Sequence, residues 1–323
     1  MINKLCLALF LTACGVVSPL NLNLVSEGSI RHFPFAFDVN GKTLVCWSEH
    51  ADAYIAGSVD ACTVIGNNKP ASRNKDFYLS GVVQTGDYLL GESYITYAGN
   101  GNTVITNGWL SSDQGVTWVP QPGVMTLPKP GKVRESGWGG YLFHRRLHID
   151  PIDGAIVGTV YGNYADDPNW YSTLWVKSRD MGLTWSVISA VAAGPIGTEG
   201  YGEPVSAFCK GQIVVVTRTG LGPPMAITRS FDNGYTWEAP HSLDLIGWDP
   251  DLLAVNDTLI LSYGLPGEVH IAESRDCGRN WNVVKSLDLP TSSGYTGLSY
   301  DGKLSVFTDY LSETKIIGNV TWQ

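Results

Sequence analysis

The chain has 323 residues, of which 44% are hydrophobic and 16% charged, and its formal net charge is -9. This apolar content can fill the core of one large domain or two ordinary ones, and the low charge with 11% aromatic residues excludes a disordered protein. The acidic balance argues against a nucleic-acid partner, because phosphate binding requires a basic surface. With 37 glycines and 17 prolines, the composition favours a turn-rich, all-β domain.

Residues 1–18 have the pattern of a signal peptide. Lys4 precedes a short apolar run over residues 5–13, and small residues follow it, which is typical of export signals. The run is too short to span a bilayer, which requires about 20 apolar residues. The Leu-Thr-Ala-Cys quartet ending at Cys14 resembles a bacterial lipobox, which predicts a lipid-anchored cell-surface or outer-membrane protein. Ordinary cleavage near Ser18, followed by secretion, is the alternative.

The cysteine count is consistent with an oxidising compartment. Loss of Cys6 with the signal, and lipidation of Cys14, leave an even number of cysteines, namely Cys46, Cys62, Cys209 and Cys277. Cys46 and Cys62 could close a local loop, and the other two are the remaining pair. No cysteine or histidine spacing indicates a metal site, so we expect no cofactor.

A turn followed by an apolar, β-branched run recurs along residues 28–323. Turn dipeptides next to such runs are signals of β-hairpins. Six copies occur, with turns at Asn40-Gly41, Gly86, Asp153-Gly154, Lys210-Gly211, Asn256-Asp257 and Asp301-Gly302. Regular spacing of short hairpins predicts the blades of a β-propeller.

A second repeat, S-x-D-x-G-x-(T/N)-W, follows four of these turns one hairpin later. Its copies are Ser111–Trp118, Ser178–Trp185, Ser230–Trp237 and Ser274–Trp281. In this motif, the Asp box, the aspartate binds backbone amides, the glycine takes a positive φ and the tryptophan packs beneath the turn. Its role is structural, so its residues are not catalytic candidates. The two repeats together predict an all-β, six-bladed propeller, with no clear box in the first and last blades.

Three segments between the boxes carry more specific signals. Residues 29–34 place Arg31 in a loosened Arg-Ile-Pro motif, residues 199–204 precede Arg218 at a recognisable spacing, and residues 293–295 end in a tyrosine. With the four boxes, these segments resemble the sialidase (neuraminidase) superfamily over most of the chain. The resemblance implies a six-bladed propeller of the sialidase type and an exported exo-glycosidase that acts on a carboxylated sugar of a glycan.

The resemblance also implies roles for individual residues. Arg31 and Arg218 would grip the substrate carboxylate, with Tyr201 beside them, because two guanidinium forks bind a carboxylate bidentately. Tyr295 would be the nucleophile and Glu203 the base that takes its proton, a known exception to the paired-carboxylate rule for glycosidases.

Spacing supports this grouping independently of the resemblance. Glu203 and Arg218 lie almost symmetrically about the Lys210-Gly211 turn, so antiparallel pairing places them opposite each other. Arg31 and Tyr295 each precede the first hairpin turn of their own blade by a few residues. We therefore expect all four to converge at one end of the propeller.

The sequence also departs from the sialidase pattern. The third arginine is missing from residues 259–264, and only Asp52 and Asp60 are available as the acid/base aspartate after Arg31. These departures put sialic acid itself in doubt as the substrate, although the site remains.

Two alternative functions rest on other residues. Strand alternation over residues 143–148 would place His144, Arg146 and His148 on one face, either as the polar side of a blade or as the base and arginine of a uronate-specific polysaccharide lyase. Trp248, outside the boxes, would be a core residue or a platform on which a sugar stacks. The third possibility is a non-catalytic propeller that binds glycan.

Overall fold

A computed structural model describes residues 22–50, 57–133, 139–311 and 314–318. Every regular element within these ranges is a β-strand, so the prediction of an all-β protein is confirmed. These ranges contain no helix that is long and apolar enough to cross a membrane. The signal segment expected over residues 1–18 lies outside the described residues.

Most strands belong to antiparallel groups of four that are consecutive in the sequence. One group comprises β2 (His32–Val39), β3 (Lys42–Ser48), β4 (Val59–Val64) and β5 (Ser72–Lys75). The next comprises β6 (Leu79–Thr85), β7 (Tyr88–Ser93), β9 (Thr103–Ser111) and β10 (Val119–Thr126), with the short β8 (Tyr97–Ala98) paired to β9. It is followed by β11 (Tyr141–Ile149), β12 (Ile156–Tyr164), β13 (Asp167–Ser178) and β14 (Thr184–Ala192). A parallel pairing of β10 with β14 joins these two groups into one nine-stranded sheet.

The remaining strands follow the same order. One group comprises β15 (Gly202–Cys209), β16 (Gln212–Arg218), β17 (Pro224–Ser230) and β18 (His241–Ile246). Another comprises β19 (Trp248–Val255), β20 (Thr258–Leu265), β21 (Glu268–Ser274) and β22 (Asn282–Asp288). The last combines both ends of the described chain, in the order β23 (Thr296–Tyr300), β24 (Leu304–Tyr310), β25 (Lys315–Gly318) and β1 (Asn23–Glu27).

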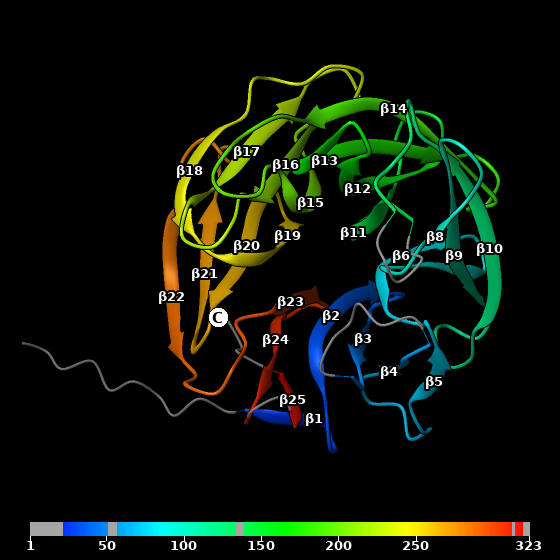
Figure 1. The fold of residues 1–323 in the computed structure, drawn as a ribbon. Helices are drawn as coiled ribbons and strands as arrows, with labels where there is room; N and C mark the ends of the chain where they lie inside the picture. The colour runs from blue at the N-terminus through cyan, green and yellow to red at the C-terminus, as the bar shows by residue number, and fades with distance from the viewer. Residues whose placement is uncertain (1–21, 51–56, 134–138, 312–313, 319–323) are drawn as a thin grey trace, which may run out of the picture.

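The first strand of each group lies nearest the centre of the molecule. These inner strands contact one another in sequence order, and β23 contacts β2, so the ring is closed. Figure 1 shows the ring from one end, with outer strands such as β22, β18 and β5 at the periphery. Radial sheets around a central axis are a propeller-like arrangement, and pairing of β1 with β25 completes the last sheet.

The two sequence repeats occupy equivalent places in the groups. The turns join first strands to second strands, and the Asp boxes join third strands to fourth strands. In one box, Ser178 Oγ accepts a hydrogen bond from the amide of Gly182 at 2.9 Å, and Asp180 accepts bonds from the amide and hydroxyl of Thr184 at 2.8 and 2.6 Å. Trp185 is only 2% exposed. The structural role predicted for the box is therefore confirmed.

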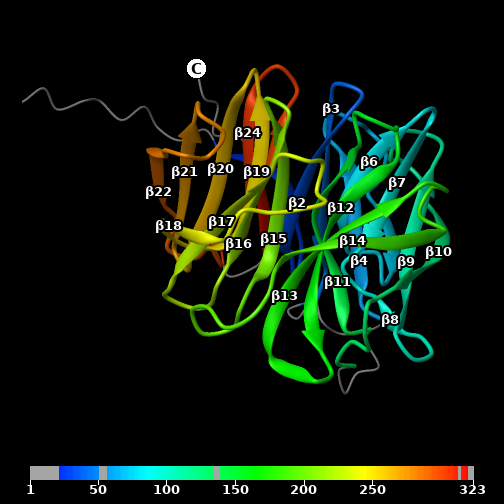
Figure 2. The same ribbon diagram turned by 90° about the horizontal axis from the view of Figure 1, so that it is seen from above.

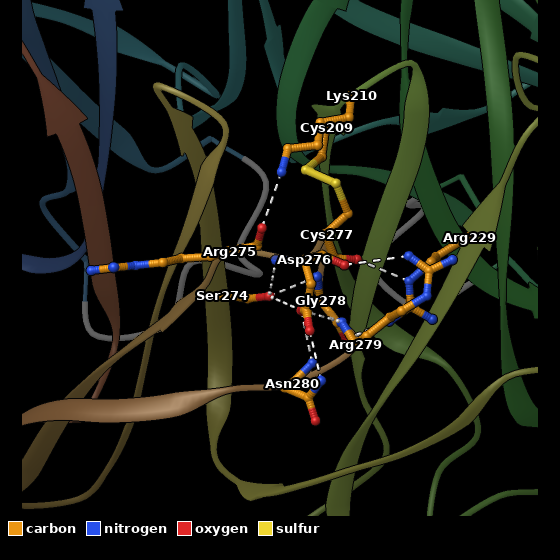
Figure 3. Close-up of a disulfide and its surroundings, with 10 residues drawn as sticks. All are labelled: Cys209, Lys210, Arg229, Ser274, Arg275, Asp276, Cys277, Gly278, Arg279 and Asn280. Carbon is orange, nitrogen blue, oxygen red and sulfur yellow. Dashed lines mark hydrogen bonds between the residues drawn. A yellow bond between two sulfur atoms is a disulfide. The ribbon is translucent and has the colours of Figure 1, made fainter.

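Two disulfides tie strands together. Cys46–Cys62 links the adjacent strands β3 and β4, and Cys209–Cys277 links the end of β15 to the Asp box of the following group. Figure 3 shows this second bridge, beside which Lys210 Nζ donates to the carbonyl of Arg275 at 3.1 Å. Disulfides persist in oxidising compartments, so both bridges suggest an extracytoplasmic protein.

Three inner strands begin with the same distortion. Phe33, Glu203 and Asp249 have φ values of 51°, 42° and 45°, each precedes a proline, and each lies at a break in strand register. Proline lacks an amide hydrogen for the ladder, so it is accommodated at a bulge. A positive φ is uncommon for such side chains. The bulges aim all three side chains into one cavity.

Candidate active site

Glu203 is the centre of a polar cluster at the start of β15. Its Oε1 accepts hydrogen bonds from Arg218 Nη1 at 2.8 Å and Tyr295 Oη at 3.4 Å, and its Oε2 accepts one from the amide of Asp249 at 2.9 Å. The residue is 5% exposed. The structure thus brings together three of the four residues expected to converge. Arg218 is opposite Gly202 in the ladder, and the bulge turns Glu203 toward it.

Arg218 is held by two carboxylates. Besides Glu203, it contacts Glu199 through Nε at 2.9 Å and Nη2 at 3.2 Å. Its guanidinium carbon lies 5.6 Å from the centre of the Trp248 ring, within the range of a cation–π contact. Burial alone would lower the pKa of Arg218, but the two carboxylates raise it, so the side chain stays charged. Burial also raises the pKa of Glu199.

Tyr295 lies just before β23 and packs against Phe33. The two ring centres are 4.4 Å apart in an edge-to-face arrangement. Both rings line a cavity with a volume of about 10 Å³, whose walls are Phe33, Phe35, Tyr78, Tyr94, His144, Glu203, Asp249 and Tyr295. That volume is about the size needed for a single water molecule. Phe33 therefore packs on Tyr295 in the wall of this cavity.

Arg31 does not join this cluster. In the described part of the chain, its guanidinium contacts Ser26 Oγ at 3.0 Å, the carbonyl of Ile30 and Glu49 at 3.2 Å. The residue two positions before Pro34, where the Arg-Ile-Pro motif has its arginine, is His32 rather than Arg31. None of these described contacts joins Arg31 to Arg218, Glu203 or Tyr295, so its place opposite Arg218 across one ligand stays a prediction.

His32 is a residue that sequence reasoning missed. It is 3% exposed, its Nδ1 contacts Asp309, and its ring centre lies 6.2 Å from that of Tyr295. The same Asp309 accepts hydrogen bonds from the hydroxyl and amide of Ser293 at 2.6 and 2.8 Å. Asp309 thus orients both His32 and the segment that carries Tyr295. Sequence spacing alone could not show that Asp309, near the end of β24, contacts His32 and Ser293.

The strand carrying His144, Arg146 and His148 does not alternate as expected. Ladder pairing skips from Phe143 to Leu147, and Arg146 has a φ of 66°. This bulge directs consecutive residues to the axis. Arg146 pairs with Asp251 through two contacts of 2.7 Å, and Arg145, which the alternation excluded, contacts Asp249.

His144 of this strand is buried and His148 is half-buried, and both rings have hydrogen-bonding partners. His144 Nε2 lies 3.1 Å from Asp249, and its Nδ1 lies 3.0 Å from the carbonyl of Pro204. His148 Nε2 lies 3.0 Å from the carbonyl and the hydroxyl of Ser206. Burial lowers the pKa of His148 to about 4, assisted by the nearby charge of Arg146. His148 is therefore neutral at physiological pH and away from the cavity, although His144 lines it.

Asp60 and Tyr201 make no described contact with Glu203, Arg218 or Tyr295. Asp60 is buried on β4, and burial raises its pKa to about 7, but none of its described contacts is with Glu203, Arg218 or Tyr295. Asp52 falls outside the described residues. Tyr201 is buried beside β15, where it packs in an apolar cluster with Ala192 and Ala226. Among the described residues, no group of three or more His, Cys, Asp or Glu side chains could hold a metal ion.

No protein-family model matches the chain, and no curated protein matches its sequence. Solved structures do match. A Dyadobacter fermentans protein of unknown function is 18% identical with a TM-score of 0.64, over 91% of this chain and 95% of its own. A Trypanosoma rangeli sialidase with the inhibitor DANA is 14% identical with a TM-score of 0.61, over 91% of this chain and 55% of its own. The chain shares the sialidase fold.

A Hadza microbial sialidase gives a similar result. It is 16% identical, with a TM-score of 0.61 over 90% of this chain and 65% of its own. This sialidase-like chain therefore spans between about half and two thirds of the sialidase chains it matches. Structures of the Trypanosoma rangeli sialidase have been solved with sialic acid and, as a covalent intermediate, with 2,3-difluorosialic acid.

Proposed function

We propose that the protein is an exported, sialidase-like exo-glycosidase that removes a carboxylated sugar from a glycan. The proposal includes a six-bladed propeller over residues 28–323, to which β1 (Asn23–Glu27) adds the outer strand of the last group, so that each antiparallel group of strands is one blade. The observation that carries the function is the hydrogen bond between Tyr295 and Glu203, with Arg218 on the same carboxylate oxygen. The sialic acid complexes of a protein with this fold support an acidic sugar as substrate.

In the proposed reaction, Tyr295 attacks the anomeric carbon while the glycosidic C–O bond breaks. Its phenolic proton passes to Glu203, which acts as the general base, and the leaving oxygen takes a proton from an acid. Water then attacks the anomeric carbon, Tyr295 leaves and recovers its proton from Glu203, and the acid recovers a proton from the water. A tyrosine nucleophile needs such a base, because its ordinary pKa is about 10.

Arg218 is the proposed partner of the substrate carboxylate. A guanidinium has five N–H groups. In the described structure one on Nη1 donates to Glu203 and one on Nη2 donates to Glu199, while Nε lies 2.9 Å from Glu199 without a hydrogen bond. This count leaves one N–H on each terminal nitrogen, the pair that binds a carboxylate as a fork. Trp248 beside Arg218 is proposed to contact the sugar, and Tyr201 supports this wall of the site from the core.

The general acid remains assigned to Asp52 or Asp60. The two are distinguished by comparing an aryl glycoside, whose leaving group needs little protonation, with a natural glycan. Loss of the acid should lower turnover of the glycan far more than that of the aryl glycoside. We expect this pattern in only one of Asp52→Asn and Asp60→Asn, and the same ratio as wild type in both variants would contradict the assignment.

The proposal is tested by trapping the covalent intermediate. Incubation with 2,3-difluorosialic acid, and with the corresponding fluorinated uronic acid, should add one sugar to Tyr295 as read by peptide mass spectrometry. Tyr295→Phe should carry no adduct and should keep the wild-type melting temperature. Turnover of sialosides or uronosides without any adduct at Tyr295 would refute this mechanism.

The small cavity favours a second function, namely glycan binding without hydrolysis. Phe33 packs on Tyr295 and leaves a space of about 10 Å³, far below the 300 Å³ or more of ordinary ligand sites. Binding of acidic glycans without release of sugar would support this function. The lyase keeps one candidate base, because His144 lines the cavity while His148 is half-buried against Ser206 and outside it. A product with the absorbance of an unsaturated uronate would favour the lyase over the hydrolase.

Export and anchoring belong to the same proposal. We infer a signal peptide within residues 1–18 that is cleaved just before Cys14, and an acyl anchor at Cys14, since a protein with disulfides must reach an oxidising compartment. Cys14→Ser should move the protein from the membrane fraction to the medium, or block its processing, because acyl chains supply the anchoring. Unchanged fractionation of Cys14→Ser would leave secretion as the correct alternative.

A further inference from the structure

A large polar groove lies beside Arg218, on the same end of the propeller as Tyr295. Its volume is about 520 Å³, and its walls are Lys132, Val133, Asn163, Pro168, Asn169, Tyr171 and Glu199. Ordinary ligand sites have volumes of about 300–1,000 Å³. The groove is thus of the size that the cavity over Tyr295 lacks.

The hairpin of β12 and β13 builds the groove. β13 has 12 residues, and Figure 2 shows this hairpin extending beyond the neighbouring strands. The segment before it adds to its edge, because Gly131 bridges Tyr164 and the amide of Lys132 donates to the carbonyl of Asn163 at 2.8 Å. On the other side, Tyr171 bridges Gly200. The walls are therefore supported by backbone hydrogen bonds.

The groove is connected to the proposed catalytic cluster by direct contacts. Glu199, at one end of the groove, binds Arg218, which in turn binds Glu203. The Tyr171 ring packs 5.2 Å from that of Tyr161. The hydroxyl of Tyr161 contacts Tyr94 in the wall of the central cavity. Arg218 therefore lies between the wall of the groove and the Tyr295–Glu203 pair.

The chemistry of the walls fits a carbohydrate. The side-chain amides of Asn163 and Asn169 offer both donors and acceptors to sugar hydroxyls, Lys132 offers donors, and Tyr171 offers an aromatic face with a polar end. We propose that this groove binds the part of the glycan beyond the cleaved bond, so that the protein acts on oligosaccharides in preference to simple glycosides. This inference rests on the proposed function.

Two kinds of variant test the groove. Asn163→Ala with Asn169→Ala removes side-chain hydrogen bonds but leaves the backbone bonds of the hairpin. Asn282→Ala, an exposed residue on β22, is the matched control. The probes are sialyllactose and trigalacturonate as oligosaccharides, with the 4-methylumbelliferyl glycosides of sialic acid and galacturonic acid as short substrates.

We expect the double variant to raise KM for the oligosaccharide about tenfold, because two hydrogen bonds of ordinary net strength are lost. Its KM for the short glycoside, and both values for Asn282→Ala, should stay within twofold of wild type. If the double variant changes KM equally for long and short substrates, or for neither, the proposal of glycan binding in the groove is refuted. The proposed hydrolase activity is not affected by that result.

Direct binding separates the groove from catalysis. Calorimetry of the oligosaccharides with Tyr295→Phe should show binding that is weakened about tenfold by the two asparagine substitutions. If no substrate is hydrolysed but this difference in binding is observed, the proposed hydrolase activity is refuted and glycan binding in the groove is supported. If neither oligosaccharide binds to Tyr295→Phe or to the wild type, the groove proposal is wrong.

Discussion

Glu203 combines burial, a positive φ and three hydrogen bonds from different parts of the chain. Arg218, Tyr295 and the amide of Asp249 are its donors, so both of its oxygens are paired, as a buried carboxylate requires. A residue held in a sparsely populated backbone conformation needs such support, and backbone strain of this kind is common at functional sites. A substitution of Glu203 is therefore the most direct test of the mechanism.

Glu203→Gln should lower turnover about a hundredfold or more, the usual scale for the loss of a general base. The amide retains the shape of the side chain, and Arg218 keeps Glu199 as a partner, so we expect only a small fall in melting temperature. Steady-state kinetics and thermal melting measure the two effects. Wild-type turnover in Glu203→Gln would remove Glu203 from the mechanism.

Phe33→Ala should open the cavity over Tyr295. The ring packs 4.4 Å from that of Tyr295 and is half-buried, so its removal makes room for a sugar at a limited cost in stability. If the ring covers the site, Phe33→Ala should lower KM for short glycosides about tenfold, with turnover unchanged or higher. Val283→Ala, at an exposed position, is the control. A higher KM would show that Phe33 contacts the substrate instead of covering the site.

Sequence reasoning paired Glu203 with Arg218 but did not identify the partners of Arg31. The first pair is local, because both residues follow from one hairpin and its turn. The side-chain direction of Arg31 depends on the bulge before Pro34, on Gly28 and on Glu49, none of which the spacing reveals. His32 was missed because its partner, Asp309, is 277 residues away in the chain.

At the level of elements, two of the Asp boxes also link neighbouring groups of strands, through Trp185 and Trp237. Trp185 Nε1 donates to Glu92 Oε1 at 3.0 Å, and Glu92 belongs to β7 in the preceding group. Glu92 is fully buried, and burial raises its pKa to about 8. A glutamic acid within an apolar interface is therefore kept protonated by the fold.

This carboxyl makes stability depend on pH. In the unfolded chain its pKa is near 4.5 and in the folded chain about 8, so between these values the folded state binds one more proton. The stability that this group contributes falls as pH rises through that window, by about 1.4 kcal/mol per pH unit. Glu92→Gln should remove this loss and flatten the dependence, as measured by urea unfolding at pH 5 and pH 8. The exposed Glu268→Gln is the control, and identical slopes in all three proteins would contradict the buried-acid interpretation.

Hairpins and boxes were predictable because their signals are local. An Asn-Gly or Lys-Gly turn and an Asp box each define their hydrogen bonds within eight residues, and both repeats fall between the expected strands. The bulges were not predictable. Alternation over residues 143–148 fails because Arg145 and Arg146 both turn to the axis to meet Asp249 and Asp251, and this ion pairing overrides the two-residue period.

The whole molecule is a ring, and its closure depends on contacts between distant segments. The strand β1 completes the sheet of β25, so the two ends of the described chain are joined by antiparallel strand pairing. The Cys209–Cys277 disulfide connects neighbouring groups across 68 residues, whereas Cys46–Cys62 spans 16 residues within one group. The first crosslink restricts the unfolded chain more strongly, because the entropy lost on closing a loop grows with its length.

The two disulfides should therefore differ in their contribution to stability. Replacing Cys209 and Cys277 together with alanine should lower the free energy of unfolding by about 4 kcal/mol, and replacing Cys46 and Cys62 together should lower it by about 3 kcal/mol. Guanidinium unfolding of the two double variants, each beside the oxidised wild type, measures the difference. Both variants should keep their activity at 25 °C, since neither bridge contacts the Glu203 cluster. A larger loss from the shorter loop would show that strain or residual structure, and not loop length, determines how these bridges stabilise the ring.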